Sequence, residues 1–237
     1  MKHLLRQLRA IPRWGWVFGI GLILFQYSFY LTGSFLSGAL GTAAHALVCK
    51  IPAIDDRIPL LPVFVLVYVY SYPFWICGAA AVSLTGKRNF VNFLCGITLA
   101  YLIGFLFFVF LPTRMDRTAE GLLEGARKAD PWVGLLRLVY AADGSTVGFN
   151  LFPSFHCLSS AFCWLGVRGR PEISRGFRLY SLVMALLISA STVLTKQHYF
   201  IDIPGGWALA LLCWLLMQRL DPGSRWKARF PGIADSR

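Results

Sequence analysis

Residues 152–202 read FPSFHCLSSAFCWLGVRGRPEISRGFRLYSLVMALLISASTVLTKQHYFID. Two apolar runs in this stretch are separated by a basic segment, and a polar island lies at each end, FPSFHC (152–157) and STVLTKQHYFID (191–202). The islands hold His156 and His198, which lie 42 residues apart, enough for one membrane crossing and a return. We therefore predict both histidines on the same side of a bilayer. An ionisable side chain at membrane depth is costly, so the pair indicates a functional site.

The composition of the 237-residue chain indicates a membrane protein. Hydrophobic residues make up 57% of it and charged residues only 14%, too few to cover a soluble domain of this size. A membrane-spanning helix needs roughly 20 apolar residues. Six candidate spans follow, at about 14–36, 59–84, 90–111, 149–167, 177–195 and 199–218.

These spans predict an all-α integral membrane protein, a six-transmembrane-helix bundle. Residues 1–13 are then a basic cytoplasmic N-terminal segment, 14–219 the six-span catalytic membrane domain and 220–237 a basic cytoplasmic tail. The outer loop 112–148 has apolar residues at roughly helical spacing, which predicts one or two short amphipathic helices between spans 3 and 4. The first span follows basic residues as a signal peptide would, but its apolar run is too long, so we expect a retained helix.

The formal charge of +12 follows from where Lys and Arg fall relative to the spans. With the N-terminus in the cytoplasm, the inner segments carry 15 of the 23 Lys and Arg, while the outer segments carry eight, balanced by eight acids. This asymmetry matches the positive-inside rule. We expect contact with membrane lipids and no nucleic-acid partner, because no basic patch is interleaved with exposed aromatics. The histidine islands then face the extracytoplasmic side.

The outer ends of the third to sixth spans gather two imidazoles, a carboxylate, a hydroxyl and two cations: Arg117, Ser154, His156, Lys196, His198 and Asp202. Such a set suits phosphoryl transfer. Cations and helix-end amides stabilise charge on the phosphoryl oxygens, one imidazole attacks phosphorus and the other protonates the leaving oxygen. Asp202, four residues after His198, can orient that ring if the segment is helical. Pro153 fits the first turn of a helix whose free amides face an anion.

Each of these residues also has a structural interpretation. Asp202 before Ile203-Pro204 resembles a helix cap, and His156 can be a satisfied structural histidine. Lys196 can be an interfacial snorkelling lysine, Ser154 a helix cap, and Arg117 the partner of a neighbouring acid. All six on one face favour chemistry over separate structural roles.

The outer loop before the second span contains Asp55, Asp56 and Arg57 between prolines. These charges either cap the following helix or face the same outer vestibule as the histidines.

Pro153-Ser154-Phe155-His156 resembles the Pro-Ser-x-His signature of the type 2 phosphatidic acid phosphatase superfamily, and Ser191…His198…Asp202 resembles its Ser-Arg-x5-His-x3-Asp signature. The local sequences FNLFPSFHC and STVLTKQHYFIDIPGG are closer to those of the branch of inositol phosphorylceramide synthase-like and sphingomyelin synthase-like proteins. The resemblance covers about 110–206. It implies that His198 forms a phosphohistidine, Asp202 orients it and His156 is the acid for the leaving group. It further implies that Ser154 and Arg117 hold the phosphoryl group, with no metal and no cofactor.

Two phosphate-binding cations of that superfamily are absent from this sequence. Phe110 stands where a lysine is expected, Thr118 replaces a proline, and Thr192 replaces the arginine of the second signature. Lys196 and Arg114 are the nearest candidates to replace the missing cations.

Together these features predict a membrane-embedded lipid phosphatase that hydrolyses a phosphomonoester or pyrophosphate of a lipid at the outer face. One alternative is a lipid phosphotransferase that passes the phospho-headgroup to a lipid or polyol hydroxyl. Another is a catalytically silent protein that binds lipid phosphate, motivated by Phe110 and Thr192. A metal-dependent hydrolase is less favoured, because no HExxH motif or third ligand accompanies the histidines. The lipid, its headgroup and the oligomeric state stay open.

Overall fold

The computed structural model describes residues 10–118, 131–144 and 147–229. The predicted segments at 1–9, 119–130, 145–146 and 230–237 lie outside the described residues. In chain order the elements are α2 (Arg13–Ala39), η1 (Thr42–His45), α3 (Pro52–Asp55), η2 (Pro62–Phe64), α4 (Val65–Val82), η3 (Ser83–Thr85), α5 (Lys87–Phe110), β1 (Arg114–Asp116), α6 (Pro131–Ala142), β2 (Val147–Phe149), α7 (Phe155–Val167), α8 (Arg175–Leu194), α9 (Asp202–Leu220) and α10 (Pro222–Arg229).

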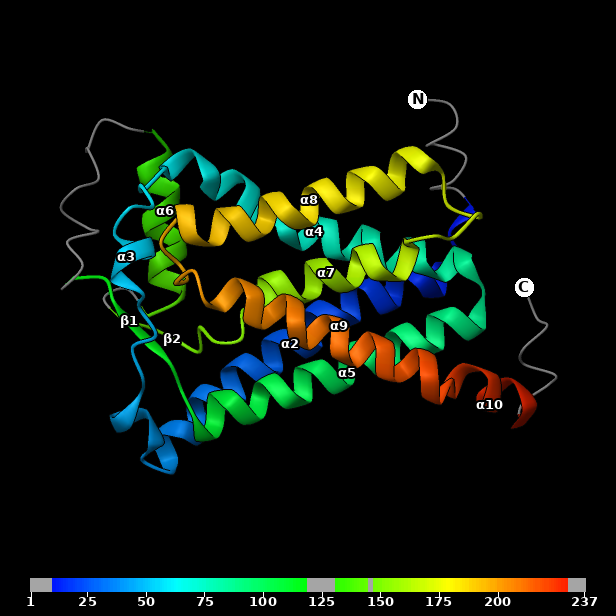
Figure 1. Ribbon diagram of the computed structural model, residues 1–237, viewed down its shortest axis with the longest axis horizontal. Coiled ribbons are helices and arrows are strands. Elements are labelled where there is room, and N and C mark those ends of the chain that lie inside the picture. The colour runs from blue at the N-terminus through cyan, green and yellow to red at the C-terminus, as the bar shows by residue number, and fades with distance from the viewer. Residues whose placement is uncertain (1–9, 119–130, 145–146, 230–237) are drawn as a thin grey trace.

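The long helices lie side by side along the longest axis of the molecule and reverse direction from one to the next (Figure 1). Within the described ranges, five helical segments are long and apolar enough to cross a membrane: Arg13–Ala39, Pro62–Thr85, Lys87–Phe110, Arg175–Leu194 and Asp202–Leu220. The protein is therefore a helical, multi-pass membrane protein. Five of the predicted spans correspond to these helices, and the fourth does not reach that length.

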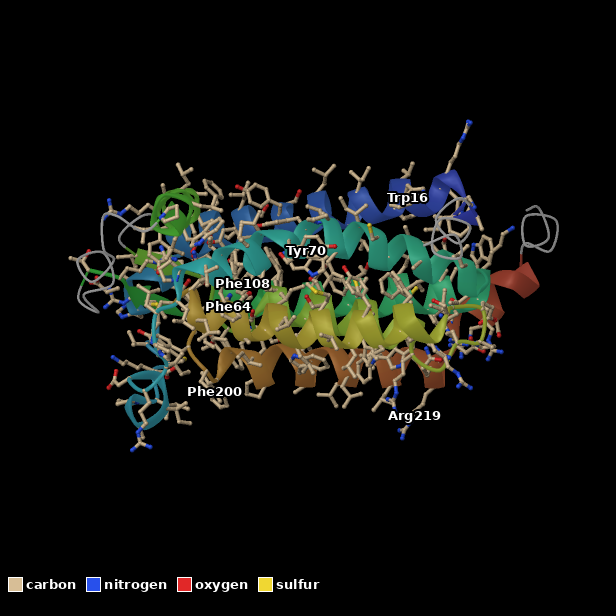
Figure 2. All side chains as sticks on the ribbon, turned by 90° about the horizontal axis from the view of Figure 1, so that it is seen from above. Trp16, Phe64, Tyr70, Phe108, Phe200 and Arg219 are labelled. Atoms are coloured by element: carbon tan, nitrogen blue, oxygen red, sulfur yellow. The ribbon has the colours of Figure 1, made fainter. Side chains whose placement is uncertain are left out.

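The flanks of the bundle expose large apolar side chains. Leu24, Phe35 and Leu212 are 64%, 73% and 66% exposed, as expected of a surface solvated by lipid tails. Side-chain nitrogens gather at the two ends of the bundle, with Trp16 and Arg219 toward one end and Phe200 toward the other (Figure 2).

The fourth predicted span is the short helix α7, which has 13 residues and forms the centre of the bundle. It packs against α4, α5, α8 and α9, and every residue in it except Trp164 is buried. The helix begins at Phe155 rather than at 149, and Pro153, expected in its first turn, precedes it. The preceding residues lie outside the helix, and the Thr113 hydroxyl accepts the amide hydrogens of Leu151 and Phe152 at 3.0 and 2.8 Å.

Strand β2, which precedes residues 150–154, pairs antiparallel with β1, with Gly148 opposite Met115. The two strands lie at the same end of the bundle as α3 and α6 (Figure 1). Helix α6 falls within the predicted outer loop 112–148 and buries Val133, Leu136 and Tyr140. This end, opposite the start of α2 and α10, holds the candidate site.

Hydrogen bonds between helices fix the rotation of α7. Trp75 Nε1 of α4 donates to Ser160 Oγ at 2.9 Å. The hydroxyl of Tyr101 on α5 lies 2.8 Å from Ser159 Oγ, and both hydroxyls donate to Gln26 Oε1 of α2. Polar side chains of this kind hold helices together inside a membrane, where apolar association has no advantage over lipid. The direction in which α7 presents His156 is thereby set.

Glycines on the neighbouring helices allow them to approach α7 closely. A Cβ added at Gly78 would lie 2.7 Å from Cys163 Sγ, and one at Gly104 would lie 2.3 Å from the Phe155 ring. On α9, a Cβ at Gly206 would lie 2.6 Å from the backbone oxygen of Ser154. Because that atom is backbone, it cannot rotate aside.

At the opposite end, α10 occupies residues 222–229 of the predicted tail and packs against α5. The Asp221 carboxylate between α9 and α10 accepts hydrogen bonds from Arg88 Nε, Asn92 Nδ2 and the Ser224 amide. These bonds, led by that from Arg88, hold the pKa of Asp221 well below its usual range. The start of the tail is therefore attached to the bundle.

We predict that Gly206→Ala destabilises the protein by about 1–3 kcal/mol, because the added methyl group must push α9 away from the start of α7. The control is Gly21→Ala on α2, where an added Cβ meets nothing within 4 Å. Thermal unfolding in detergent should show a lower midpoint for the first variant and an unchanged or slightly higher midpoint for the second. Equal midpoints would contradict close packing at Gly206.

Candidate active site

His198 lies in the turn that joins α8 to α9. The Thr192 carbonyl accepts the amides of Gln197 at 2.9 Å and His198 at 3.1 Å, which folds the turn back onto the end of α8. His198 Nδ1 lies 3.1 Å from Asp202 Oδ2, the same oxygen that accepts the Tyr199 amide at 3.0 Å. A carboxylate oxygen accepts, so Nδ1 is the ring nitrogen that donates to Asp202, and Nε2 is the nitrogen on the other side of the ring. The predicted contact between these residues is present.

Ser154 has the structural role considered from the sequence and also lies beside His198. As the N-cap of α7, its hydroxyl accepts the Cys157 amide at 3.4 Å. The same oxygen lies 3.3 Å from His198 Nε2. The start of α7 is thus placed against the nitrogen of His198 that faces away from Asp202.

His156, in the first turn of α7, is held by aromatic side chains of α4. Its ring stacks on Tyr68 with a centroid separation of 4.2 Å and meets Trp75 edge-on at 5.0 Å. Its Nε2 is buried and has no hydrogen-bond partner among the described residues. The ring centroids of His156 and His198 are 6.2 Å apart. The two imidazoles therefore converge, as the sequence predicted.

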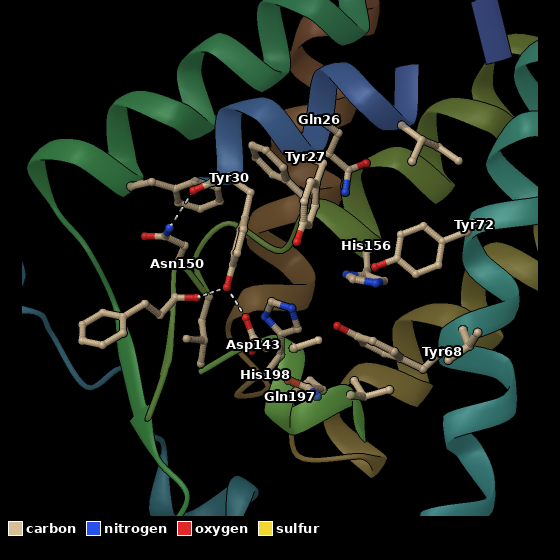
Figure 3. Close-up of a pocket in the computed structure, with 18 of the residues that line it drawn as sticks. Gln26, Tyr27, Tyr30, Tyr68, Tyr72, Asp143, Asn150, His156, Gln197 and His198 are labelled. Atoms are coloured by element: carbon tan, nitrogen blue, oxygen red, sulfur yellow. Dashed lines mark hydrogen bonds between the residues drawn. The ribbon is translucent and has the colours of Figure 1, made fainter. Parts of the chain in front are cut away.

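Both histidines line a cavity of about 350 Å³ (Figure 3). Its polar lining also includes Gln26, Tyr27, Tyr30, Tyr68, Tyr72, Asp143, Asn150 and Gln197. Apolar residues complete the walls, among them Ile23 of α2, Val69 of α4 and Leu138 of α6. Val69 and Leu138 are 38% and 67% exposed, so the walls continue to the outer surface of the bundle.

Arg117 is fully buried behind this lining. Its Nη2 donates to Asp143 Oδ2 at 2.6 Å and to Gln197 Oε1 at 2.7 Å. Its guanidinium lies 4.5 Å from the centroid of the Tyr140 ring. On the far side of the same carboxylate, Tyr30 donates its hydroxyl to Asp143 Oδ1. Asp143 and Gln197 thus stand between Arg117 and the cavity.

Tyr140 attaches α6 to the histidine-bearing turn. Its hydroxyl donates to the Thr195 carbonyl at 2.7 Å. Burial raises the pKa of Tyr140 to about 12, so the hydroxyl keeps the proton that it donates.

The two cations proposed as replacements do not line the cavity. Lys196 Nζ donates to the Asp55 carbonyl at 2.9 Å. Arg114 is exposed on β1. Of the two substituted positions, Phe110 is 59% exposed at the end of α5, whereas Thr192 is buried and donates its hydroxyl to the Ser189 carbonyl.

A family model described as the PAP2 superfamily matches residues 51–216. The chain belongs to the PAP2 superfamily. Phosphatases and related phosphotransferases generally make up this superfamily, so membership supports an enzyme of that kind acting on lipids. The matched region contains both histidine motifs. The comparisons with curated proteins and with solved structures found no match.

The candidate metal ligands and the thiols of this PAP2 superfamily member complete the description of the site. Within the described ranges, no group of three or more His, Cys, Asp or Glu side chains is placed to hold a metal ion. All six cysteines lie in those ranges as free thiols.

Sequence reasoning missed Asp143, Gln197 and the tyrosines Tyr30, Tyr68 and Tyr72 as cavity residues. Gln197 had a signal, because it directly precedes His198 in the PAP2 motif region. The others come from α2, α4 and the end of α6, and no motif spacing relates them to the histidines.

Asp55 clamps the turn that carries His198. Its carboxylate accepts the Ile51 amide at 2.6 Å and the Phe200 amide at 2.8 Å. Its backbone oxygen also holds Lys196. The loop before the second span therefore supports the turn from outside the cavity and does not face the vestibule through this acid.

We predict that Asp55→Ala loosens this turn, because the Phe200 amide loses its acceptor. We expect about 1–3 kcal/mol of destabilisation and faster amide hydrogen exchange in a peptide covering 195–201. The control is the neighbouring change Asp56→Ala, which removes a surface ion pair with Lys50. A pair of this kind contributes at most about 1 kcal/mol. Equal exchange in the two variants would contradict the clamp.

Proposed function

We propose that this protein is a membrane-embedded lipid phosphatase, which hydrolyses a phosphomonoester or pyrophosphate of a lipid through a phosphohistidine at His198. One observation carries the proposal: two imidazoles with rings 6.2 Å apart line one cavity. One of them is oriented by a carboxylate, and Nε2 of the other has no hydrogen-bond partner among the described residues. Membership of the PAP2 superfamily agrees with this chemistry.

The first step forms a bond between His198 Nε2 and phosphorus and breaks the bond from phosphorus to the leaving oxygen. Asp202 accepts the hydrogen bond of Nδ1 and stabilises the positive charge that develops on the ring. His156 gives its proton to the leaving oxygen, which departs as the lipid hydroxyl or phosphate. In the second step His156 takes a proton from water, water oxygen attacks phosphorus, and His198 leaves.

Among the predicted phosphate-binding residues, Ser154 is best placed, because its hydroxyl lies 3.3 Å from the attacking nitrogen. Arg117 lies behind Asp143 and Gln197 and is paired with the Asp143 carboxylate, so it acts on the site through these side chains and not as a direct phosphate ligand. Lys196 and Arg114, the candidates to replace the missing cations, do not line this cavity; Lys196 lines a separate small pocket with Asp55 and His198.

The cavity walls support a lipid substrate. Apolar side chains from α2, α4 and α6 line the space beside the histidines. Among the described residues, Arg13, Lys87 and Arg175 begin α2, α5 and α8 at the end of the bundle opposite the histidines. By the positive-inside rule the termini are then cytoplasmic and the site extracytoplasmic.

A lipid phosphotransferase is the second candidate, supported by the resemblance of FNLFPSFHC and STVLTKQHYFIDIPGG to the inositol phosphorylceramide synthase-like and sphingomyelin synthase-like branch. Its chemistry shares the phosphohistidine and replaces water by an acceptor hydroxyl. To separate the two functions, purified protein is incubated with phosphatidate, with and without a long-chain alcohol. A phosphatase releases free phosphate, whereas a phosphotransferase forms a new phosphorylated lipid from the alcohol. A parallel incubation with a chelator tests the expected metal independence.

We predict that His198→Ala abolishes turnover, because no other group replaces the nucleophile. The control is His45→Ala, an exposed histidine at the end of η1 that does not line the cavity. Acid-labile labelling of the protein from ³²P-phosphatidate should disappear only in the first variant. Unchanged turnover of His198→Ala would leave the silent, lipid-binding alternative.

His156→Ala should lower phosphatidate turnover about 10²–10⁴-fold, the range for loss of a general acid. The rate at which the protein itself becomes phosphorylated should fall much less with ³²P-labelled p-nitrophenyl phosphate than with ³²P-phosphatidate, because the p-nitrophenolate leaving group departs without a proton. Equal losses on both substrates would contradict the assignment of His156 as the acid.

A further inference from the structure

Gln197 is the one member of the Arg117 network that directly precedes the nucleophile. Its side chain is 3% exposed and lines the cavity. Its Oε1 accepts from Arg117 Nη2 at 2.7 Å, while its Nε2 has no hydrogen-bond partner among the described residues. A buried amide nitrogen without an acceptor is rare and calls for an explanation.

The orientation of this amide follows from the chemistry of its neighbour. A guanidinium has donors and no acceptor, so the atom that faces Arg117 must be the amide oxygen. The NH₂ group is then the end left for the cavity, with two hydrogens to donate. Arg117 is itself buried under Asp143 and Tyr140, which holds the amide in this orientation.

The backbone of Gln197 is equally constrained. The Thr192 carbonyl binds its amide and that of His198, so the two side chains leave one rigid turn. Thr192 stands where the superfamily signature has an arginine, and its own hydroxyl is bound to Ser189. The site therefore lacks a cation at position 192. The Gln197 side chain, whose backbone amide binds the Thr192 carbonyl, has an unused NH₂ donor instead.

We propose that the Gln197 amide nitrogen binds a phosphoryl oxygen of the substrate and supplies part of the stabilisation that the missing cations would give. This inference rests on the proposed phosphohistidine chemistry. Arg117 acts through Gln197, because its charge polarises the amide whose oxygen it binds. The ligand class is a phosphoryl group, and the contact strengthens as negative charge grows on its oxygens.

Two substitutions separate this role from a purely structural one. Gln197→Glu keeps an acceptor for Arg117 but replaces the NH₂ donor by an oxygen that repels phosphate. Gln197→Met keeps the length of the side chain and removes both functions. If Gln197 only satisfies Arg117, the Glu variant stays active and the Met variant loses stability and activity together. If it binds phosphate, both lose activity and the Glu variant loses at least as much.

The matched control is Gln218→Glu. Gln218 lies near the end of α9 at the opposite end of the bundle, and its Nε2 is also buried without a partner among the described residues. The same chemical change there should leave turnover and thermal midpoint as in the wild type.

The experiment measures kcat/KM on phosphatidate in mixed micelles, the inhibition constant of orthovanadate and the thermal midpoint for all four proteins. We expect Gln197→Glu to lose at least about 100-fold in kcat/KM, the usual effect of removing one oxyanion donor, and to bind orthovanadate correspondingly more weakly. Its thermal midpoint should match the wild type. Near-wild-type kcat/KM and orthovanadate inhibition in this variant would overturn the inference.

The failure of the two proposals is distinguishable. If wild-type protein forms no phosphohistidine and releases no phosphate, the proposed function fails. If His198→Ala is inactive while Gln197→Glu is fully active, the phosphohistidine stands and the role of Gln197 is wrong.

Discussion

A helix of 13 residues cannot cross a bilayer alone, and the architecture of this protein depends on how α7 is enclosed. Polar backbone and side-chain groups at membrane depth must be satisfied by protein. Four helices supply that environment, through glycines that admit α7 closely and through side chains that bind Ser159 and Ser160. Its short length places Ser154 and His156 inside the bundle instead of on its rim. The candidate site follows from this enclosure.

The groups around the two histidines are of two kinds: those that hold the histidines in place and those that face the cavity. Asp202, Asp55 and the Thr192 carbonyl hold the turn of His198, while Tyr68 and Trp75 hold the His156 ring. Among the described residues, Asp143 and Gln197 join Arg117 to the cavity. An ion pair between a buried arginine and a carboxylate carries no net charge. At the proposed site a phosphoryl group would therefore meet oriented neutral donors more than exposed cations, in agreement with the two substitutions in the motifs.

Much of this could be predicted from the sequence because apolar runs and short motifs are local signals. The five long spans, the common end of His156 and His198, and the reach of Asp202 to His198 all follow from spacing along the chain. The start of α7 was predicted too early, since the Thr113 hydroxyl that binds the amides of Leu151 and Phe152 is about 40 residues distant in sequence. Asp143 and the tyrosines were missed for the same reason: only packing of α2, α4 and α6 brings them to the histidines. Arg117 was expected at the phosphate, but the partners that bury it are visible only in three dimensions.

The cavity walls on α2 and α4 continue to the lipid-facing flank, where Tyr27 is 52% and Val69 38% exposed. A molecule dissolved in the bilayer meets such an opening by two-dimensional diffusion, without passing through water. The quantity that governs saturation is then the mole fraction of substrate in the surface rather than its bulk molarity. Adding inert detergent or lipid at constant total substrate dilutes that surface and slows encounter, although every molecule of substrate is still present.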